Sequence, residues 1–197
     1  MPPAVVQRTT AELTKALLAL ADMPSGFSIE PDDNSEDDVT LSSKDPRCAA
    51  LVRYANADMP PGSKASANRS FSGGEQGPFI DESLDAMGSA KAVAVLQRSF
   101  QSAIKACTKL TITVPGEGRA PIVVREVSAP KVGTNPVAVR FTAGGALEGF
   151  EVTMVTTGVK DVVVSLSMVA GLPEDIDGAL EAAVGKAEET LTTKTAG

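Results

Sequence analysis

The chain has 197 residues, of which 43% are hydrophobic and 22% charged, so it is not globally disordered and is long enough for one domain with a substantial core. Its net charge of −7, with Lys and Arg standing singly along the sequence, argues against nucleic-acid binding. No apolar stretch reaches the about 18 residues of a membrane-spanning helix. Histidine is absent, which excludes Ser-His-Asp triads and the usual zinc sites.

The start of the chain predicts a helix followed by a hairpin. Leucines recur at helical spacing within residues 9–22. Residues 27–29 and 39–41 alternate like two short strands, and we expect them to pair around the acidic loop 31–38. This loop fails as a calcium-binding EF-hand because Asp37 stands where the turn glycine belongs, so a solvated hairpin tip is the better interpretation.

The middle of the chain predicts a helix, a second hairpin and a long helix. Asp45-Pro46 is a helix start, with Asp as the N-cap and Pro at the first helical position. Weaker alternation over residues 65–72 and 78–87 predicts two paired strands joined by a glycine-rich turn. Residues 89–108 place apolar side chains on one face and give the clearest helix of the sequence.

The second half turns to β-branched segments divided by Gly or Pro turns, and then to a last helix from Pro173 to about Leu191. The predicted strands are residues 110–114, 121–127, 137–142, 150–156 and 162–169. The fold class is therefore α+β: an antiparallel sheet, with a meander of about five strands plus hairpins, packed by about four helices on one face. We expect a flexible segment at residues 1–8, a single domain at 9–192 and a frayed tail at 193–197.

The two cysteines, Cys48 and Cys107, lie on the apolar faces of their predicted helices, so both should face one core. A disulfide between them would close a loop of about 59 residues and contribute on the order of 4 kcal/mol of stability. The alternative is a pair of unrelated buried thiols in a cytosolic protein. The count of two, the lack of histidine and the Pro-rich start, which looks like that of a trimmed lipoprotein or ectodomain, favour the disulfide.

Three short segments carry a resemblance: residues 17–27, the run Asp45-Pro46-Arg47-Cys48, and the pair Ala106-Cys107. They resemble the PknH-ectodomain family of actinobacterial cell-envelope sensor-like domains, which includes small mycobacterial lipoproteins. The resemblance implies an extracytoplasmic, disulfide-stapled, non-catalytic domain whose sheet and helices frame a cleft for an unidentified ligand. The kinase member has a second disulfide, for which this chain has no cysteines.

We therefore expect a non-catalytic binding or sensor-like domain of a cell-envelope lipoprotein, lipid-anchored or secreted, that presents a cleft to a small hydrophobic or lipidic ligand. No cofactor or metal is expected. The large side chains Tyr54, Phe71, Phe79 and Phe100 are the predicted cleft lining. One alternative is a structural or interaction module that docks through its sheet face on a cell-wall component or membrane protein. Another is a histidine-free enzyme, which would need two Ser, Lys or carboxylate groups converging in a cleft.

Overall fold

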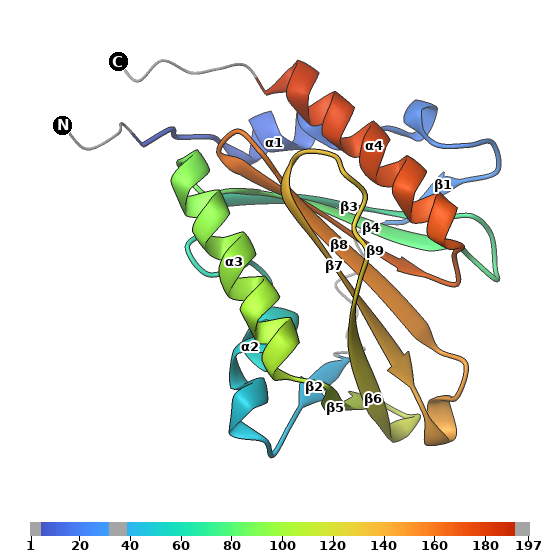
Figure 1. Ribbon diagram of the computed structural model, residues 1–197. Helices are drawn as coiled ribbons and strands as arrows, with labels where there is room; N and C mark the ends of the chain where they lie inside the picture. The colour runs from blue at the N-terminus through green and yellow to red at the C-terminus, as the bar shows by residue number, and fades with distance from the viewer. Residues whose placement is uncertain (1–4, 32–38, 192–197) are drawn as a thin grey trace.

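The computed structural model describes residues 5–31 and 39–191. Within them, nine strands form one antiparallel sheet in the order β1-β3-β4-β9-β8-β7-β6-β5-β2 (Figure 1). The strands are β1 (Ser28–Ile29), β2 (Thr40–Ser42), β3 (Ala65–Ser72), β4 (Phe79–Ala86), β5 (Lys109–Val114), β6 (Gly118–Val127), β7 (Thr134–Ala143), β8 (Glu151–Val159) and β9 (Val162–Val169). The helices are α1 (Thr10–Ala16), α2 (Ala49–Ala55), α3 (Ala90–Ala106) and α4 (Pro173–Thr190), with single 3-10 turns η1 (Leu20–Asp22), η2 (Pro46–Cys48) and η3 (Gly145–Leu147).

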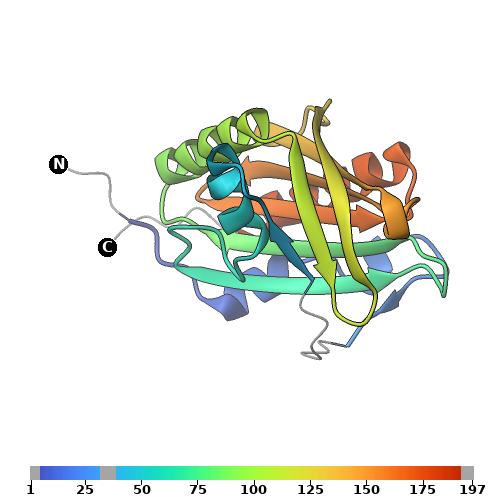
Figure 2. The same cartoon turned by 90° about the horizontal axis from the view of Figure 1, so that it is seen from below.

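Helices cover both faces of the sheet, and the expectation that they cover one face is wrong. Figure 2 shows α1 on one side of β3 and β4, with α2 and α3 on the other. The cause is visible in β9, where Leu166 is buried in the core beneath α1 and α4 while Val163 is buried in a cluster with residues of α3. Successive side chains of a strand point to opposite faces, so a strand buried on both faces needs helices on both.

From β3 onward the chain follows the sequence prediction closely. The hairpin β3–β4, the helix α3, the meander β5 to β9 and the helix α4 are all confirmed. The sheet is larger than the predicted five-strand meander because the hairpin and two short strands join the same sheet. In Figure 2 the strands β5 and β6 cross β3 and β4 at a steep angle, so the twisted sheet curls around α2 and α3.

The predicted first helix is shorter than expected because tertiary hydrogen bonds replace helical ones. Thr9 and Glu12 form a capping box at the start of α1, which ends at Ala16. Beyond that point the backbone N–H of Leu18 donates to Glu82 Oε2 at 2.8 Å. The carbonyl of Leu18 accepts from Arg69 Nη1 at 2.5 Å, so the chain leaves the helix to pair with the sheet.

The predicted first hairpin is wrong. Strand β1 pairs with β3, with Ser28 opposite Ser72, whereas β2 pairs with β5, with Leu41 opposite Ile112. The two segments therefore lie at opposite edges of the sheet. Most of the acidic loop predicted between them, residues 32–38, lies outside the described residues.

A buried ion pair fastens the segment before α1 to the sheet. Arg8 Nε donates to both carboxylate oxygens of Asp161, at 2.9 and 2.8 Å, and Nη2 donates at 2.5 Å. Both side chains are almost fully buried, and Asp161 stands in the tight turn between β8 and β9. Because each charge is removed from water, the loss of one partner leaves the other uncompensated.

The substitution Arg8→Met should lower the free energy of unfolding by about 3 kcal/mol, because it leaves the buried carboxylate of Asp161 without its counter-charge. The matched control is Arg47→Met, which breaks the exposed pair with Asp45 and should leave stability nearly unchanged. Urea denaturation of both variants measures the difference. Equal effects would show that burial does not set the strength of the Arg8 pair.

Glu82 is a buried carboxyl on the face of the sheet that packs beneath α1 and α4. Its side chain is 1% exposed, and Oε1 has no hydrogen-bond partner among the described residues. Burial raises the pKa of Glu82 to about 7, against the hydrogen bond from Leu18, which lowers it. A carboxyl whose folded pKa lies above its unfolded value stabilises the fold most at low pH, and that contribution disappears as the pH rises through the folded pKa.

The contribution of Glu82 to stability should therefore fall by about 3 kcal/mol between pH 4.5 and pH 8. Glu82→Gln keeps the acceptor for Leu18 and removes the titration, so its unfolding free energy relative to the wild type should rise over this range. Denaturant melts at stepped pH measure this, with the exposed Glu181→Gln as control. A wild-type and Glu82→Gln difference that does not change with pH would contradict the assignment.

Candidate functional site

The candidate site is a cavity of about 560 Å³ between the helices α2 and α3 and the face of the sheet beneath them. Seven strands, the two helices, the segment that follows α2 and Phe150 beside β8 contribute to its walls. Its size falls within the range of about 300 to 1,000 Å³ that is usual for small-molecule sites. The sheet curls around α2 and α3 (Figure 2), and residues of β5 and β6 as well as of both helices line the cavity.

A disulfide holds together the helices α2 and α3, which form the roof of the cleft. Cys48 ends η2, and Cys107 caps the C-terminus of α3; their Cα atoms are 4.7 Å apart, within the normal range for a disulfide. The expected disulfide is thus present. It ties α2, which follows directly after Cys48, to the end of α3 and the start of β5.

Two aromatic side chains meet beneath the roof. Tyr54 of α2 and Phe100 of α3 pack edge to face, with ring centroids 5.5 Å apart and planes at 78°. Both line the cavity. This contact and the disulfide hold α2 against α3 at two points along the roof.

The walls of the cavity differ in polarity. The side formed by β5 to β8 and the roof is mainly apolar, with Gln97 and Thr156 as polar exceptions, and it includes Ile112, Ile122, Phe141, Phe150, Val152 and Met154. The side formed by β4 and β9 is mainly polar, with Val163 and Val169 as apolar exceptions, and it includes Asp81, Ser83, Asp85, Ser165 and Ser167. Register explains the polar side, because Asp81 lies opposite Ser167 and Ser83 opposite Ser165 on the same face of the sheet.

The two carboxylates of the polar side differ in environment. Asp85 is 2% exposed and accepts from the hydroxyls of Ser63 at 3.2 Å and Ser83 at 3.3 Å. Burial raises the pKa of Asp85, and the hydroxyl groups around it oppose that rise. Asp81 is exposed at the edge of the cavity, where Ser167 Oγ lies 3.4 Å from Oδ2.

Gln97 of α3 connects the roof to the sheet. Its Oε1 accepts from the hydroxyl of Thr156 at 2.8 Å, and its Nε2 donates to the carbonyl of Asn135 at 3.1 Å. Gln97 is 1% exposed, and both Gln97 and Thr156 line the cavity. The buried amide therefore fixes the distance between α3 and the strands β7 and β8.

The four predicted lining residues separate into two pairs. Tyr54 and Phe100 line the cleft. Phe71 is 1% exposed and lies in the core on the other face, beneath α1 and α4. Phe79 is on the cleft face, opposite Val169, but is not among the residues that line the cavity.

The sequence reasoning missed the polar wall. The signal was the alternation of Asp81, Ser83 and Asp85 with apolar or buried neighbours, repeated by Ser165 and Ser167 in β9. In sequence such a row reads as the solvent face of a strand. Only the pairing of β4 with β9, far away in the chain, brings the two rows together.

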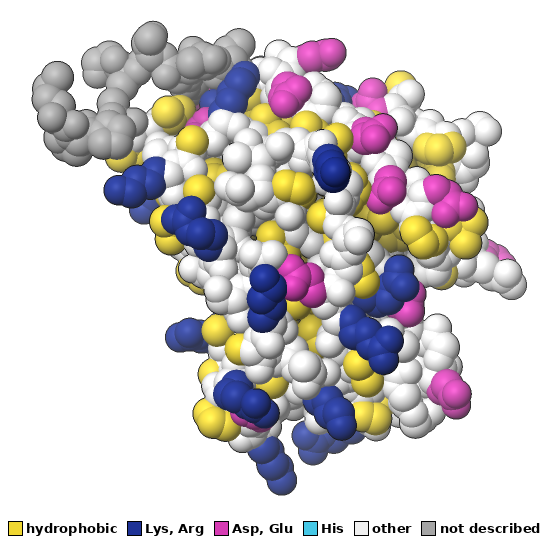
Figure 3. Space-filling model, viewed as in Figure 1, with side chains coloured by type: hydrophobic (Ala, Val, Ile, Leu, Met, Phe, Trp, Pro, Cys, Tyr) yellow, Lys and Arg dark blue, Asp and Glu magenta, His cyan; other side chains and the backbone are white. Residues whose placement is uncertain are grey.

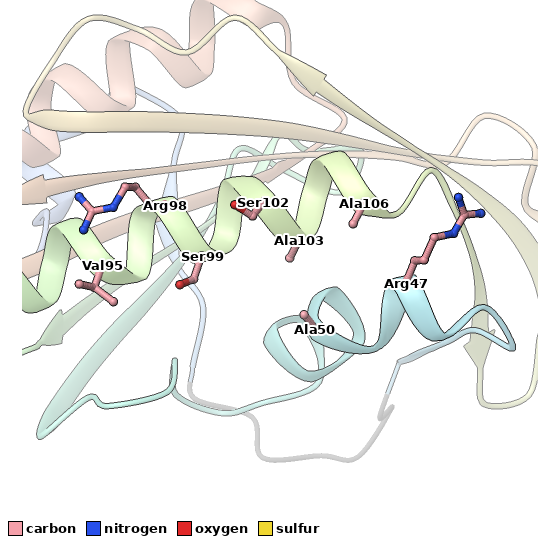
Figure 4. Close-up of a pocket in the computed structure, with 8 residues that line it drawn as sticks. All are labelled: Arg47, Ala50, Val95, Arg98, Ser99, Ser102, Ala103 and Ala106. Atoms are coloured by element: carbon pink, nitrogen blue, oxygen red, sulfur yellow. The ribbon is translucent and has the colours of Figure 1, made fainter.

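A second hollow lies on the outside of the roof, between α2 and α3. It measures about 440 Å³, and Figure 4 shows Arg47 and Arg98 at its opposite ends with Ser99 and Ser102 between them. Arg47 is already paired with Asp45 at 2.6 Å. The hollow therefore does not bring its two positive charges to one point.

Charges of the two signs lie over different parts of the surface. On the face shown in Figure 3, Lys and Arg side chains lie mainly on the left and over the lower half, and acidic side chains gather toward the upper right. In residues 5–31 and 39–191, no group of three or more His, Cys, Asp or Glu side chains is arranged to hold a metal ion. The helices in those same ranges are too short or too polar to cross a membrane.

No protein-family model matches the chain, and no curated protein matches it. The helix-covered antiparallel sheet is nevertheless a fold seen in a solved structure. A crystal structure of the extracellular domain of PknH from Mycobacterium tuberculosis superposes with a TM-score of 0.66 at 18% identity, covering 95% of this chain and 97% of that one. This similarity confirms the expected PknH-ectodomain-like fold.

Removing the disulfide should both destabilise the domain and loosen the cleft. For the loop of 59 residues between the cysteines, the double variant Cys48→Ser/Cys107→Ser should lose about 4 kcal/mol of unfolding free energy. Hydrogen exchange should rise most in α2, because the disulfide joins this short helix to α3. Unchanged exchange in α2 would contradict the role given to the disulfide.

Proposed function

We propose that this chain is a non-catalytic, extracytoplasmic binding domain that takes a small hydrophobic or lipidic ligand into the cleft between α2, α3 and the sheet. The observation that carries the proposal is the cavity of about 560 Å³ with one apolar and one polar side. Ligand sites typically combine an apolar lining with a few placed polar groups. Tyr54 and Phe100 are its aromatic contacts in the roof.

Two observations support a location outside the cytoplasm. Disulfides persist in oxidising compartments and are rare in the cytosol, and the disulfide Cys48–Cys107 holds the roof of the cleft. The similar structure is described as an extracellular domain. We propose a cell-envelope protein, lipid-anchored or secreted.

The cleft does not favour catalysis. Asp81 and Asp85 are four residues apart on β4, so their Cα atoms are separated by roughly 13 Å. In glycosidases the two catalytic carboxyl groups themselves stand about 5 to 9.5 Å apart, so the side chains of Asp81 and Asp85 would have to lean toward each other to reach that spacing. Asp85 is also engaged by the hydroxyls of Ser63 and Ser83. The arrangement suits recognition of a ligand better than acid–base chemistry.

Docking through a sheet face is the weaker alternative. It would require a broad exposed apolar surface on the sheet. In the part of the chain that the structure describes, core clusters beneath α1 and α4 and beneath α2 and α3 bury apolar side chains on both faces. The cleft, in contrast, offers an apolar surface that a small ligand can fill.

The intrinsic fluorescence of the protein tests the proposal directly. Tyr54 is the one tyrosine, and the chain has no tryptophan, so tyrosine fluorescence reports on the roof of the cleft without a label. Decyl maltoside, titrated below its micelle-forming concentration, should change this fluorescence in a saturable manner at one site per chain.

The matched variants are Phe150→Ala and Phe79→Ala, which remove similarly exposed rings, 38% and 36%, of which the first lines the cavity and the second does not. Phe150→Ala should weaken binding about tenfold, through the loss of apolar contact area. Phe79→Ala should leave it unchanged. No saturable signal, or equal losses in the two variants, would rule out this cleft as the binding site.

A further inference from the structure

The charges that line the cleft are all of one sign. They are Asp58, after α2, and Asp81 and Asp85 on β4; in the described residues no Lys or Arg contributes to the walls. This is unlike the outer hollow on the roof, where the charged residues are both arginines. The acidic lining is therefore a property of the cleft and is not shared by the outer hollow, although α2 and α3 border both.

The acidic groups are not spread evenly through the cleft. Asp81 and Asp85 stand on β4 beside the hydroxyls of β9, and Asp58 is on the exposed segment leading away from α2. Opposite them, the walls from β5 to β8 contribute Phe141, Val152 and other apolar side chains. A ligand lying across the strands would thus meet carboxylates and hydroxyls at one end and an apolar surface at the other.

The chemistry of the polar end defines the head group it can hold. A carboxylate is an acceptor, and serine hydroxyls rotate to donate or accept, so the end as a whole favours a ligand that donates. A negatively charged head group would be placed beside the carboxylate of Asp81, and like charges at that distance repel each other. Asp81 is exposed beside Ser167 and so is the carboxylate of the polar side that an entering head group meets.

We propose that the ligand of the cleft is an amphiphile with an uncharged or cationic head group that donates hydrogen bonds, either an amine or a polyol, and that anionic amphiphiles are rejected. This proposal rests on the proposed function, since it concerns the same cleft. The head group lies against Asp81 and the serines of β4 and β9. The apolar chain lies along β7 and β8 beneath Phe100.

Three probes with the same decyl chain test the proposal by Tyr54 fluorescence below their micelle-forming concentrations. Decylamine carries a cationic donor head, decyl maltoside a neutral polyol, and decyl sulfate an anion. The first two should bind, and decyl sulfate should bind at least tenfold more weakly than the better of them. The ratio of decylamine to maltoside affinity then tells an amine head group from a sugar.

The variant Asp81→Asn tests whether the carboxylate of Asp81 recognises the head group of the ligand. It should weaken decylamine binding about fivefold and strengthen that of decyl sulfate, so that the two affinities approach each other. The matched control is Asp177→Asn, which makes the same change of net charge on the exposed side of α4, away from the cleft. The control should leave all three affinities unchanged.

The outcomes separate the two levels of the proposal. If none of the three probes binds, the cleft is not a ligand site and the proposed function is overturned. If decyl sulfate binds as tightly as the others, the function stands and the choice of head group is overturned. The same holds if Asp81→Asn shifts all affinities equally, or if Asp177→Asn has the same effect as Asp81→Asn.

Discussion

The alternation of side chains along each strand is the constraint on which the other features of this fold depend. In β4 and β9 one set of side chains packs beneath α1 and α4, with Leu84 and Leu166 at 0% exposure. The intervening set points to the other face, where Asp81 and Ser167 lie opposite each other. The sheet thereby carries a continuous hydrophobic core on one face. On the other face, side chains fill only part of the space between the sheet and the helices. The unfilled part becomes the cleft because α3 packs on β6 to β9 while the short helix α2 contacts β2 at the edge of the sheet, so the two helices do not fill the whole face.

The cleft also requires that α2 and α3, which form its roof, be held in place above the sheet. The helix α2 has only seven residues, too few to be stable by itself, and it is tied by the disulfide Cys48–Cys107 and by the packing of Tyr54 on Phe100. Gln97, buried between α3 and β8, sets how far the roof stands above the sheet. The cleft is thus built from contacts between segments far apart in the chain. Its polar wall adds negative charge at one end of an otherwise apolar cleft, so a bound amphiphile would be held in one orientation.

Most of the fold could be predicted from local patterns in the sequence, whereas the rest depends on pairings between segments that are distant in the chain. The long helix α3 and the meander β5 to β9 were predictable because their periodicity and turns are local. The partners of β1 and β2 were not, since each pairs with a strand distant in sequence rather than with the other. The early end of α1 was hidden for the same reason: Leu18 continues the leucine pattern, but its backbone bonds to Glu82 and Arg69. Among the predicted lining residues, the aromatic character of Phe71 could not reveal which face of β3 it occupies.

Two methionines on opposite faces of neighbouring strands provide the most direct measurement. Met154 of β8 lines the cleft, and Met168 of β9 is buried in the core beneath α1 and α4. With methyl-labelled methionine, saturating decyl maltoside should shift the Met154 methyl signal in NMR spectra and give nuclear Overhauser effects between that methyl group and the alkyl chain. The Met168 signal should stay in place. A Met154 signal unaffected by the ligand, or a shift confined to Met168, would contradict ligand binding in the cleft.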